Sequence, residues 1–176
     1  MSGDEEGGPS VVFATPWFRI EELPARPEWG IGGEPFYRLA APDGVTVVAV
    51  DQDGRLLLVR QYRPSRGRVS LELPAGEIGP GETPAIAARR ELIEETGHDC
   101  AELLALGSGG LAVNRESSST HAFLARGLSA VGAAEYEVVR VRPREVPALM
   151  ADGAFEHLAG LGALLLAHWR AGIDLG

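Results

Sequence analysis

Hydrophobic residues gather in short runs along the chain, and each run ends at a turn signal rich in Gly, Pro or Asp. Runs of this length and composition, rich in Val, Leu and aromatic residues, are typical of β-strands. The pattern predicts six strands, at residues 36–40, 45–50, 55–62, 102–106, 120–125 and 136–141. The turn signal at 51–54 predicts that the second and third of these form a hairpin, and the Gly/Ser-rich residues 107–110 are expected to form a loop.

Three segments have helical signals instead. Residues 84–96 follow Thr83, a suitable N-cap, begin with Pro84 and stop at Gly97. Two further helices are predicted at 143–151 and 156–170. Strands on both sides of one central helix, with helices at the end, predict an α/β/α sandwich around a mixed β-sheet. The proline-punctuated residues 11–42 would add N-terminal antiparallel strands to it.

Composition narrows the class of protein. A chain of 176 residues that is 45% hydrophobic predicts a single domain over residues 11–176 behind a disordered lead-in at 1–10. The net charge of -9 argues against nucleic-acid binding. The only cysteine, Cys100, can form no internal disulfide, and the acidic start of the chain has no export signal, so we expect a cytoplasmic protein. The apolar run at 158–169 is too short to cross a membrane.

Three carboxylates crowd the end of the predicted central helix. At 100° per residue, Glu91, Glu94 and Glu95 fall within an arc of roughly 100°, and Ile86 and Ile93 lie on the other side. Like charges one turn apart destabilise a helix. A solvated face with an Arg90–Glu94 ion pair would account for such a run in many proteins, so the wider spacing decides the interpretation.

That spacing reads G-x5-E-x7-R-E-L-x-E-E-x-G from Gly76 to Gly97, and at these eight positions the chain resembles the Nudix hydrolases. It departs from their usual pattern at His98, where the family has an aliphatic residue. The strand order and the terminal helices also resemble the Nudix fold.

The resemblance implies a Mg2+ site, with Mn2+ as a substitute. It makes Glu91 and Glu95 direct ligands, Glu94 a ligand or a holder of metal-bound water, and the backbone carbonyl of Ala75 a further ligand. Carboxylates on one rigid helix face suit Mg2+, which prefers hard oxygen ligands and counters phosphate charge. Arg90 and Glu82 would orient the carboxylates and brace the loop against the helix, with Gly76 and Gly97 as structural support.

A basic island precedes this box, with four arginines in nine residues. They are Arg60, Arg63, Arg66 and Arg68. Gln-Tyr-Arg-Pro followed by Leu-Glu-Leu-Pro-Ala-Gly resembles the ADP-ribose and nucleotide-sugar pyrophosphatase branch. This implies that Arg63 contacts the diphosphate and that Glu72 borders the site. Arg60 is a further candidate, while Arg66 and Arg68 fit a solvated loop equally well.

The same branch implies a homodimer whose N-terminal strands contribute to the partner's pocket. Trp17, Phe18 or Trp29 would then stack on a base, although such residues also serve as core or interface residues. Downstream, no proline occurs between Pro84 and Pro143, where ADP-ribose hydrolases usually carry one. Glu116 resembles the loop glutamate that serves as general base or extra ligand. Glu94 and Glu95 are competing choices for the base, and pairing with Arg115 is the structural alternative for Glu116.

These features predict Mg2+-dependent hydrolysis of a nucleoside diphosphate derivative, ADP-ribose or a nucleotide sugar, to a nucleoside monophosphate and a phosphorylated product. Neither nucleic acid nor a membrane is an expected partner. Coenzyme A and dinucleoside polyphosphates remain alternative substrates. A non-catalytic module that senses nucleotides is the alternative of another class, and such a module would be expected to have lost carboxylates of the box.

Overall fold

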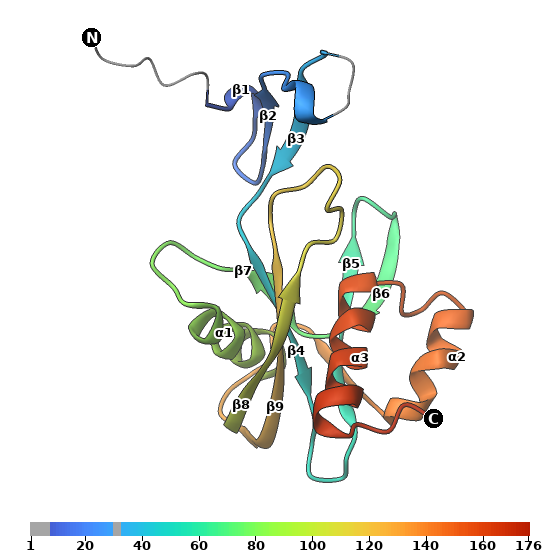
Figure 1. The fold of residues 1–176 in the computed structure, drawn as a ribbon. Helices are drawn as coiled ribbons and strands as arrows, with labels where there is room; N and C mark the ends of the chain where they lie inside the picture. The colour runs from blue at the N-terminus through green and yellow to red at the C-terminus, as the bar shows by residue number, and fades with distance from the viewer. Residues whose placement is uncertain (1–7, 30–32) are drawn as a thin grey trace. The chain divides into compact units, whose positions relative to one another are not determined.

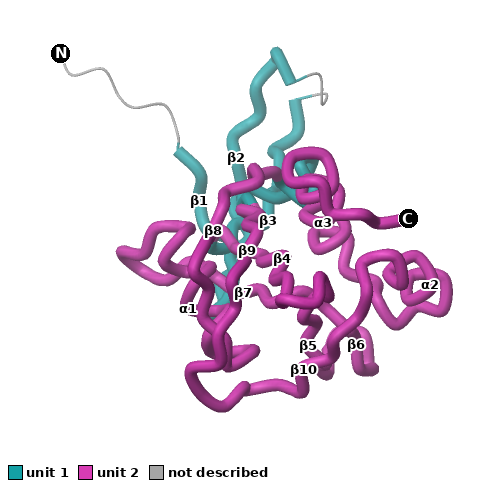
Figure 2. The backbone as a smooth tube through the Cα atoms, turned by 90° about the horizontal axis from the view of Figure 1, so that it is seen from below, with its two compact units in different colours: residues 1–42, 110–119 teal, residues 43–109, 120–176 magenta. Residues whose placement is uncertain are grey.

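The computed structural model describes residues 8–29 and 33–176, which form two compact units (Figure 2). Unit 1 holds the residues up to Pro42 together with Gly110–Ser119, and unit 2 holds Asp43–Gly109 and Thr120–Gly176. Most of the expected lead-in at 1–10 lies outside the described residues, and β1 already begins at Ser10.

Unit 1 is built on a three-stranded antiparallel sheet in the order β1-β2-β3. Its strands are Ser10–Ala14, Arg19–Leu23 and Phe36–Ala40, with a 3-10 turn at Pro27–Trp29. The loop 110–119 attaches to β3 through Leu39, whose amide donates to the carbonyl of Arg115 at 2.8 Å and whose carbonyl accepts from Ser117 at 3.0 Å. The expected N-terminal antiparallel strands are therefore confirmed.

Unit 2 contains two sheets. The four-stranded sheet has the order β7-β4-β9-β8, in which β4 and β9 are parallel and the other pairs antiparallel. Its strands are β4 (Gly44–Ala49), β7 (Ala75–Glu77), β8 (His98–Gly109) and β9 (Thr120–Ala130). The second sheet, β10-β5-β6, is antiparallel and consists of Leu56–Arg63 (β5), Arg68–Glu72 (β6) and Glu137–Val141 (β10).

Alternation along β4 builds two cores. Val45, Val47 and Ala49 pack with α1 (Pro84–Thr96), whereas Val48 packs with α3 (Leu158–Ala171). Successive side chains of a strand point to opposite faces, so the two helices cover opposite sides of the mixed sheet (Figure 1). This confirms the predicted α/β/α sandwich.

The bounds of α1 follow from local chemistry, as predicted. The Thr83 side chain accepts from the amide of Ile86 at 3.3 Å, Pro84 begins the helix, and Gly97 ends it in the left-handed conformation with φ of 69°. The core-facing side is Ala87, Ala88, Leu92, Glu95 and Thr96, whereas Ile86 is exposed. Glu95 therefore belongs to the buried side of the helix.

The chain ends in a 3-10 turn at Pro143–Glu145, α2 (Val146–Ala151) and α3, close to the predicted bounds. Within residues 8–29 and 33–176, no helix is long and apolar enough to cross a membrane.

Two local predictions are wrong. Strands β4 and β5 do not form a hairpin, because they belong to different sheets and share only the bridge between Val50 and Leu56. β4 is instead paired on both sides, by β7 and β9. The Gly/Ser-rich residues 107–109 are the end of β8 rather than a loop, since their pairing with β9 continues to Gly109 and Thr120.

We expect Gly97→Ala to destabilise unit 2 much more than Gly172→Ala. Both glycines end helices with nearly equal positive φ, 69° and 70°. A Cβ at Gly97 would lie 2.5 Å from the carbonyl oxygen of Gly132, whereas one at Gly172 has nothing within 4 Å. Left-handed strain costs each variant about 1 kcal/mol, and the backbone clash adds roughly 1–3 kcal/mol at Gly97 alone. Urea unfolding measures both, and equal losses would refute the clash.

Candidate active site

The predicted box is built where β7 meets α1. A Cβ on Gly76 would lie 2.0 Å from Oε1 of Glu91, so any other residue at this position would displace the carboxylate from its place against the strand. The loop between them is tied down by Glu82, whose Oε2 accepts from the amide of Gly79 at 2.8 Å. Gly76 and Glu82 thus occupy the supporting positions that the spacing implies.

Arg90 is the central cation of the box. Its Nε and Nη2 donate to Glu82 at 2.8 and 2.9 Å, and Nη2 also donates to the carbonyl of Glu77. Its Nη1 donates to Glu91 at 2.6 Å and to Glu94 at 3.1 Å. The expected contacts of Arg90 and Glu82 are present, as is the Arg90–Glu94 pair. Arg90 and the Gly79 amide lower the pKa of Glu82 to about 2.

Glu95 is the acid of the box that Arg90 does not bind. It is only 5% exposed, and its Oε2 accepts from the Ala75 amide at 2.9 Å. Burial raises the pKa of Glu95 to about 7 against the hydrogen bond from Ala75, and the charges of Glu91 and Glu135 act in the same direction as burial. Burial also raises the pKa of Glu91, although Arg90 opposes it.

The residues of the box fit a hard divalent cation. Two nearly buried carboxylates with raised pKa values, Glu91 and Glu95, favour a cation that would offset their charge. Their oxygens are the ligand type that Mg2+ prefers. Within the part of the chain that the structure describes, no three acidic, His or Cys side chains already converge on one point. Arg90 accounts for this at Glu91 and Glu94, because it holds both carboxylates.

Arg63 projects from β5 as a fixed phosphate-binding candidate. Its Nε and Nη2 donate to the two oxygens of Glu72 at 2.8 and 2.7 Å, and Glu72 is only 4% exposed. Arg63 and Glu95 also interact electrostatically: the arginine lowers the pKa of Glu95, and Glu95 raises that of Arg63. The structure therefore brings Arg63 and Glu72 together and sets Arg63 beside the box.

The other arginines of the basic island have different partners. Arg60 lies on the opposite face of β5 from Arg63 by strand alternation and pairs with Glu137 at 3.2 Å. Arg66 and Arg68 both bind Glu156. The structure does not bring these three together with Arg63.

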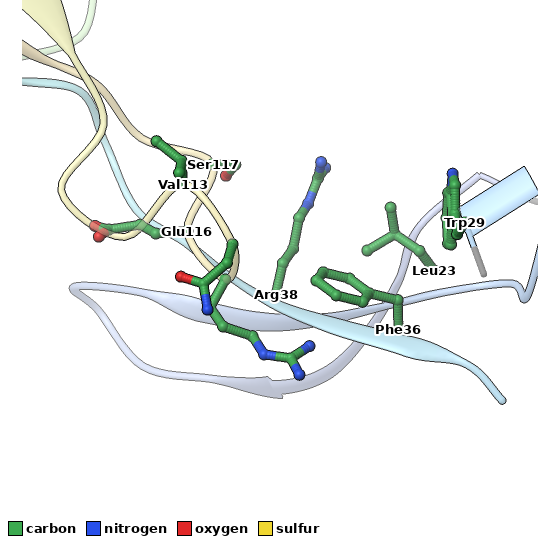
Figure 3. Close-up of a pocket in the computed structure, with 9 residues that line it drawn as sticks. Leu23, Trp29, Phe36, Arg38, Val113, Glu116 and Ser117 are labelled. Atoms are coloured by element: carbon green, nitrogen blue, oxygen red, sulfur yellow. The ribbon is translucent and has the colours of Figure 1, made fainter. Parts of the chain in front are cut away.

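A second candidate site lies within unit 1, where a pocket of about 360 Å³ opens between β3 and the loop 110–119. Figure 3 shows Phe36, Leu23 and Trp29 in a row, with Arg38 between this row and the loop that carries Glu116. The rings of Trp29 and Phe36 meet edge to face at 6.1 Å, and the Arg115 guanidinium lies 4.6 Å from the centre of Phe36.

Of the aromatic and loop residues that the sequence suggested as substrate contacts, the structure places only some at this pocket. Trp29 and Glu116 line this pocket, whereas Trp17 is 69% exposed and does not. The ring of Phe18 is tilted against that of Phe13, with 6.3 Å between the two ring centres. Glu116 accepts from Ser118 Oγ at 2.6 Å.

Sequence reasoning missed three polar residues beside the box. The amide of Glu135 donates to the carbonyl of Glu94 at 2.9 Å, which sets Glu135 at the end of α1. Tyr136 follows, and its hydroxyl accepts from Gln61 Nε2 at 2.7 Å. Gln61 stands in the Gln-Tyr-Arg-Pro motif and carried a signal, but the other two follow the box by 40 residues and meet it only in three dimensions.

Comparisons with known proteins agree with this geometry. A Bacillus subtilis protein named ADP-ribose pyrophosphatase is 36% identical over 88 residues, 50% of this chain and 48% of that protein. The methanol dehydrogenase activator of Bacillus methanolicus is 35% identical over the same length, again 50% of this chain and 48% of that protein. The chain thus spans about half the length of these curated relatives. A mouse ADP-sugar pyrophosphatase is 48% identical over 60 residues, 32% of this chain and 28% of that protein.

A crystal structure titled an ADP compounds hydrolase has the same fold, with a TM-score of 0.75, 23% identity and coverage of 96% of this chain and 95% of that one. The family profile described as the NUDIX domain matches residues 41–152, which include the whole box and the basic island. With this match over more than half of its length, the chain belongs to the Nudix domain family.

Proposed function

We propose that this chain hydrolyses the diphosphate linkage of a nucleoside diphosphate derivative, with ADP-ribose or an ADP-sugar as the first choice of substrate. The observation that carries the proposal is the pair of carboxylates formed by the buried Glu95 and the partly buried Glu91, beside the fixed guanidinium of Arg63. The names of the relatives support this substrate class. The products would be a nucleoside monophosphate and a phosphorylated second product.

Mg2+, or Mn2+ in its place, fits the box through Glu91, Glu95 and the backbone carbonyl of Ala75, with Glu94 beside them. A cation there supplies positive charge for the diphosphate oxygens and acidifies water. Arg90 binds Oε1 of Glu91, so Oε2 of Glu91 would be left for the cation. The other nitrogens of Arg90 bind Glu82, which would keep the arginine in place.

Arg63 would bind the diphosphate. The pair with Glu72 occupies Nε and one hydrogen of Nη2, so Nη1 and the other Nη2 hydrogen are left for phosphate oxygens. Glu72 is buried under this fork and acts on a phosphate through Arg63. In the reaction, the oxygen of water bonds to one phosphorus, the bond from that phosphorus to the bridging oxygen breaks, and a proton of the water passes to a carboxylate.

Glu135 adds a proton acceptor to those that the sequence suggests. It is exposed, its backbone is anchored to α1, and its charge acts on Glu95. Glu94 is held by Arg90, and Glu91 and Glu95 are needed for the cation. We therefore propose Glu135 as the general base, with Glu116 as the competing choice, and the homodimer of the resembling branch as the assembly.

We expect hydrolysis of a diphosphate from a panel of ADP-ribose, ADP-sugars, coenzyme A and dinucleoside polyphosphates, measured with Mg2+ by coupled phosphate release. Glu95→Gln should lower kcat by about 10²-fold or more, because it removes a charged ligand. Glu135→Gln should lower kcat by about 10²-fold and keep Mg2+ binding, as fits a base. Glu102→Gln, an exposed acid on β8, is the control.

No turnover of any compound, or an unchanged rate in Glu95→Gln, would refute the hydrolase. Binding of a nucleotide without turnover would favour the sensing module. A larger loss in Glu116→Gln than in Glu135→Gln would assign the base to Glu116.

The metal-free protein should lose stability from Glu95 as pH rises from 5 to 8. The pKa of Glu95 is raised to about 7, from 4.5 for an ordinary glutamate, so between these two pH values the folded chain keeps a proton that the unfolded chain has lost, and above about pH 7 the loss of stability levels off. Glu95→Gln should match the wild type near pH 5 and exceed its unfolding free energy by roughly 2 kcal/mol at pH 8. Since Mg2+ requires the carboxylate, its stabilisation of the wild type should grow over the same interval. Urea unfolding with and without Mg2+ measures both effects. If the difference in unfolding free energy between Glu95→Gln and the wild type did not change with pH, the raised pKa of Glu95 would be contradicted.

The pocket of unit 1 would receive the aromatic base of the substrate. Trp29→Ala or Phe36→Ala should weaken binding of AMP, and raise KM, about tenfold, because stacking on an aromatic ring contributes about 1–3 kcal/mol per base. Calorimetric titration with AMP measures the affinity. Trp169→Ala, which removes an exposed tryptophan of α3, is the matched control. Unchanged AMP affinity in both pocket variants would exclude this pocket as the base site.

A further inference from the structure

The imidazole of His157 lies against the Arg63–Glu72 pair. His157 directly precedes α3, and its Nδ1 is 3.7 Å from Oε2 of Glu72. This Nδ1 is inaccessible to solvent and has no hydrogen-bond partner. A buried polar atom without a partner is destabilising, so its position beside a carboxylate calls for an explanation.

Several contacts hold the imidazole in this place. The amide of Leu71 in β6 donates to the carbonyl of Ala154 at 2.8 Å, and Glu156 binds both Arg66 of the β5–β6 turn and Arg68 at the start of β6. A Cβ on Gly160 would lie 3.6 Å from Nδ1 of His157, so α3 itself closes the space behind the ring. The segment that enters α3 is thus attached to the hairpin that carries Arg63.

Only one tautomer suits the carboxylate. With the proton on Nδ1, the ring presents a donor to Oε2 of Glu72; with the proton on Nε2, it would turn a lone pair toward the oxygen's lone pairs. Burial lowers the pKa of His157 and keeps the ring neutral, with Glu72 opposing and Arg63 supporting this shift. The charged groups near the ring are Glu72 from β6, Arg63 from β5 and Glu156 next in the chain.

We propose that His157 is a positioning residue, whose Nδ1–H donates to Glu72 and fixes the carboxylate that aims Arg63 at the diphosphate. The gap of 3.7 Å exceeds a hydrogen bond by less than an ångström, which a small rotation of the ring closes. The proposal rests on the proposed function, in which Arg63 binds phosphate. It gives the C-terminal helix a role in substrate affinity, because His157 acts on Arg63 through Glu72.

Kinetics separate this role from a packing role. In His157→Leu the donor is lost and the bulk is kept, so KM should rise about tenfold while kcat changes less than threefold. In His157→Asn the side-chain amide can replace the Nδ1–H donor, so KM should return to within about threefold of the wild type. His168→Asn, at an exposed histidine of α3, should leave both constants unchanged. Thermal unfolding of each variant monitors the fold.

An unchanged KM in His157→Leu would overturn the proposal. A raised KM in His157→Asn, in a variant that folds like the wild type, would also overturn it. So would losses of kcat that run parallel to losses of thermal stability in both His157 variants.

A second measurement does not require turnover. Nitrogen-15 spectra of the imidazoles in the metal-free and substrate-free protein should show His157 neutral at pH 7.5 with its proton on Nδ1. Glu72→Gln should shift this resonance, and Glu102→Gln should not. A proton on Nε2, or no response to Glu72→Gln, would overturn the proposal even in an active enzyme. The expected spectrum in a protein that hydrolyses nothing would refute the proposed function and keep the contact.

Discussion

The close approach of β7 to α1 is the constraint on which the site depends. With no side chain at Gly76, the strand lies against the Glu91 carboxylate, and the next amide back along the strand, that of Ala75, reaches Glu95. Both acids are thereby partly removed from water. This destabilises their charged forms, which a bound cation would stabilise. The glycine-rich loop supports this approach, because Glu82 binds both the amide of Gly79 in the loop and the side chain of Arg90 on the helix.

The same region was the most predictable part of the chain, for a physical reason. The cap at Thr83, the proline at the first turn and the left-handed glycine at Gly97 are local signals, and each sets a helix boundary without help from distant residues. The Arg90–Glu82 contact also follows from spacing along one loop and helix. By contrast, the sequence cannot show that β4 pairs with β9 rather than β5, because that pairing joins segments about 75 residues apart.

The basic island illustrates the same limit. Four arginines close in sequence look alike, but strand alternation sends Arg60 away from Arg63, and a glutamate from the C-terminal region binds Arg66 and Arg68. Glu135 and His157 were invisible for a related reason: their importance lies in what they meet across the fold. The family motif identified the chemistry of the site, whereas the residues that orient it come from segments with no motif.

Arg90 gives the folded protein an internal counter-ion. By binding Glu91 and Glu94 of α1 together with Glu82 of the preceding loop, it offsets part of the repulsion among the acids of the box. This compensation belongs to the chain itself and needs no bound cation. Glu95 differs from the other acids of the box, because Arg90 binds Glu82, Glu91 and Glu94 and leaves Glu95 to its amide partner on β7.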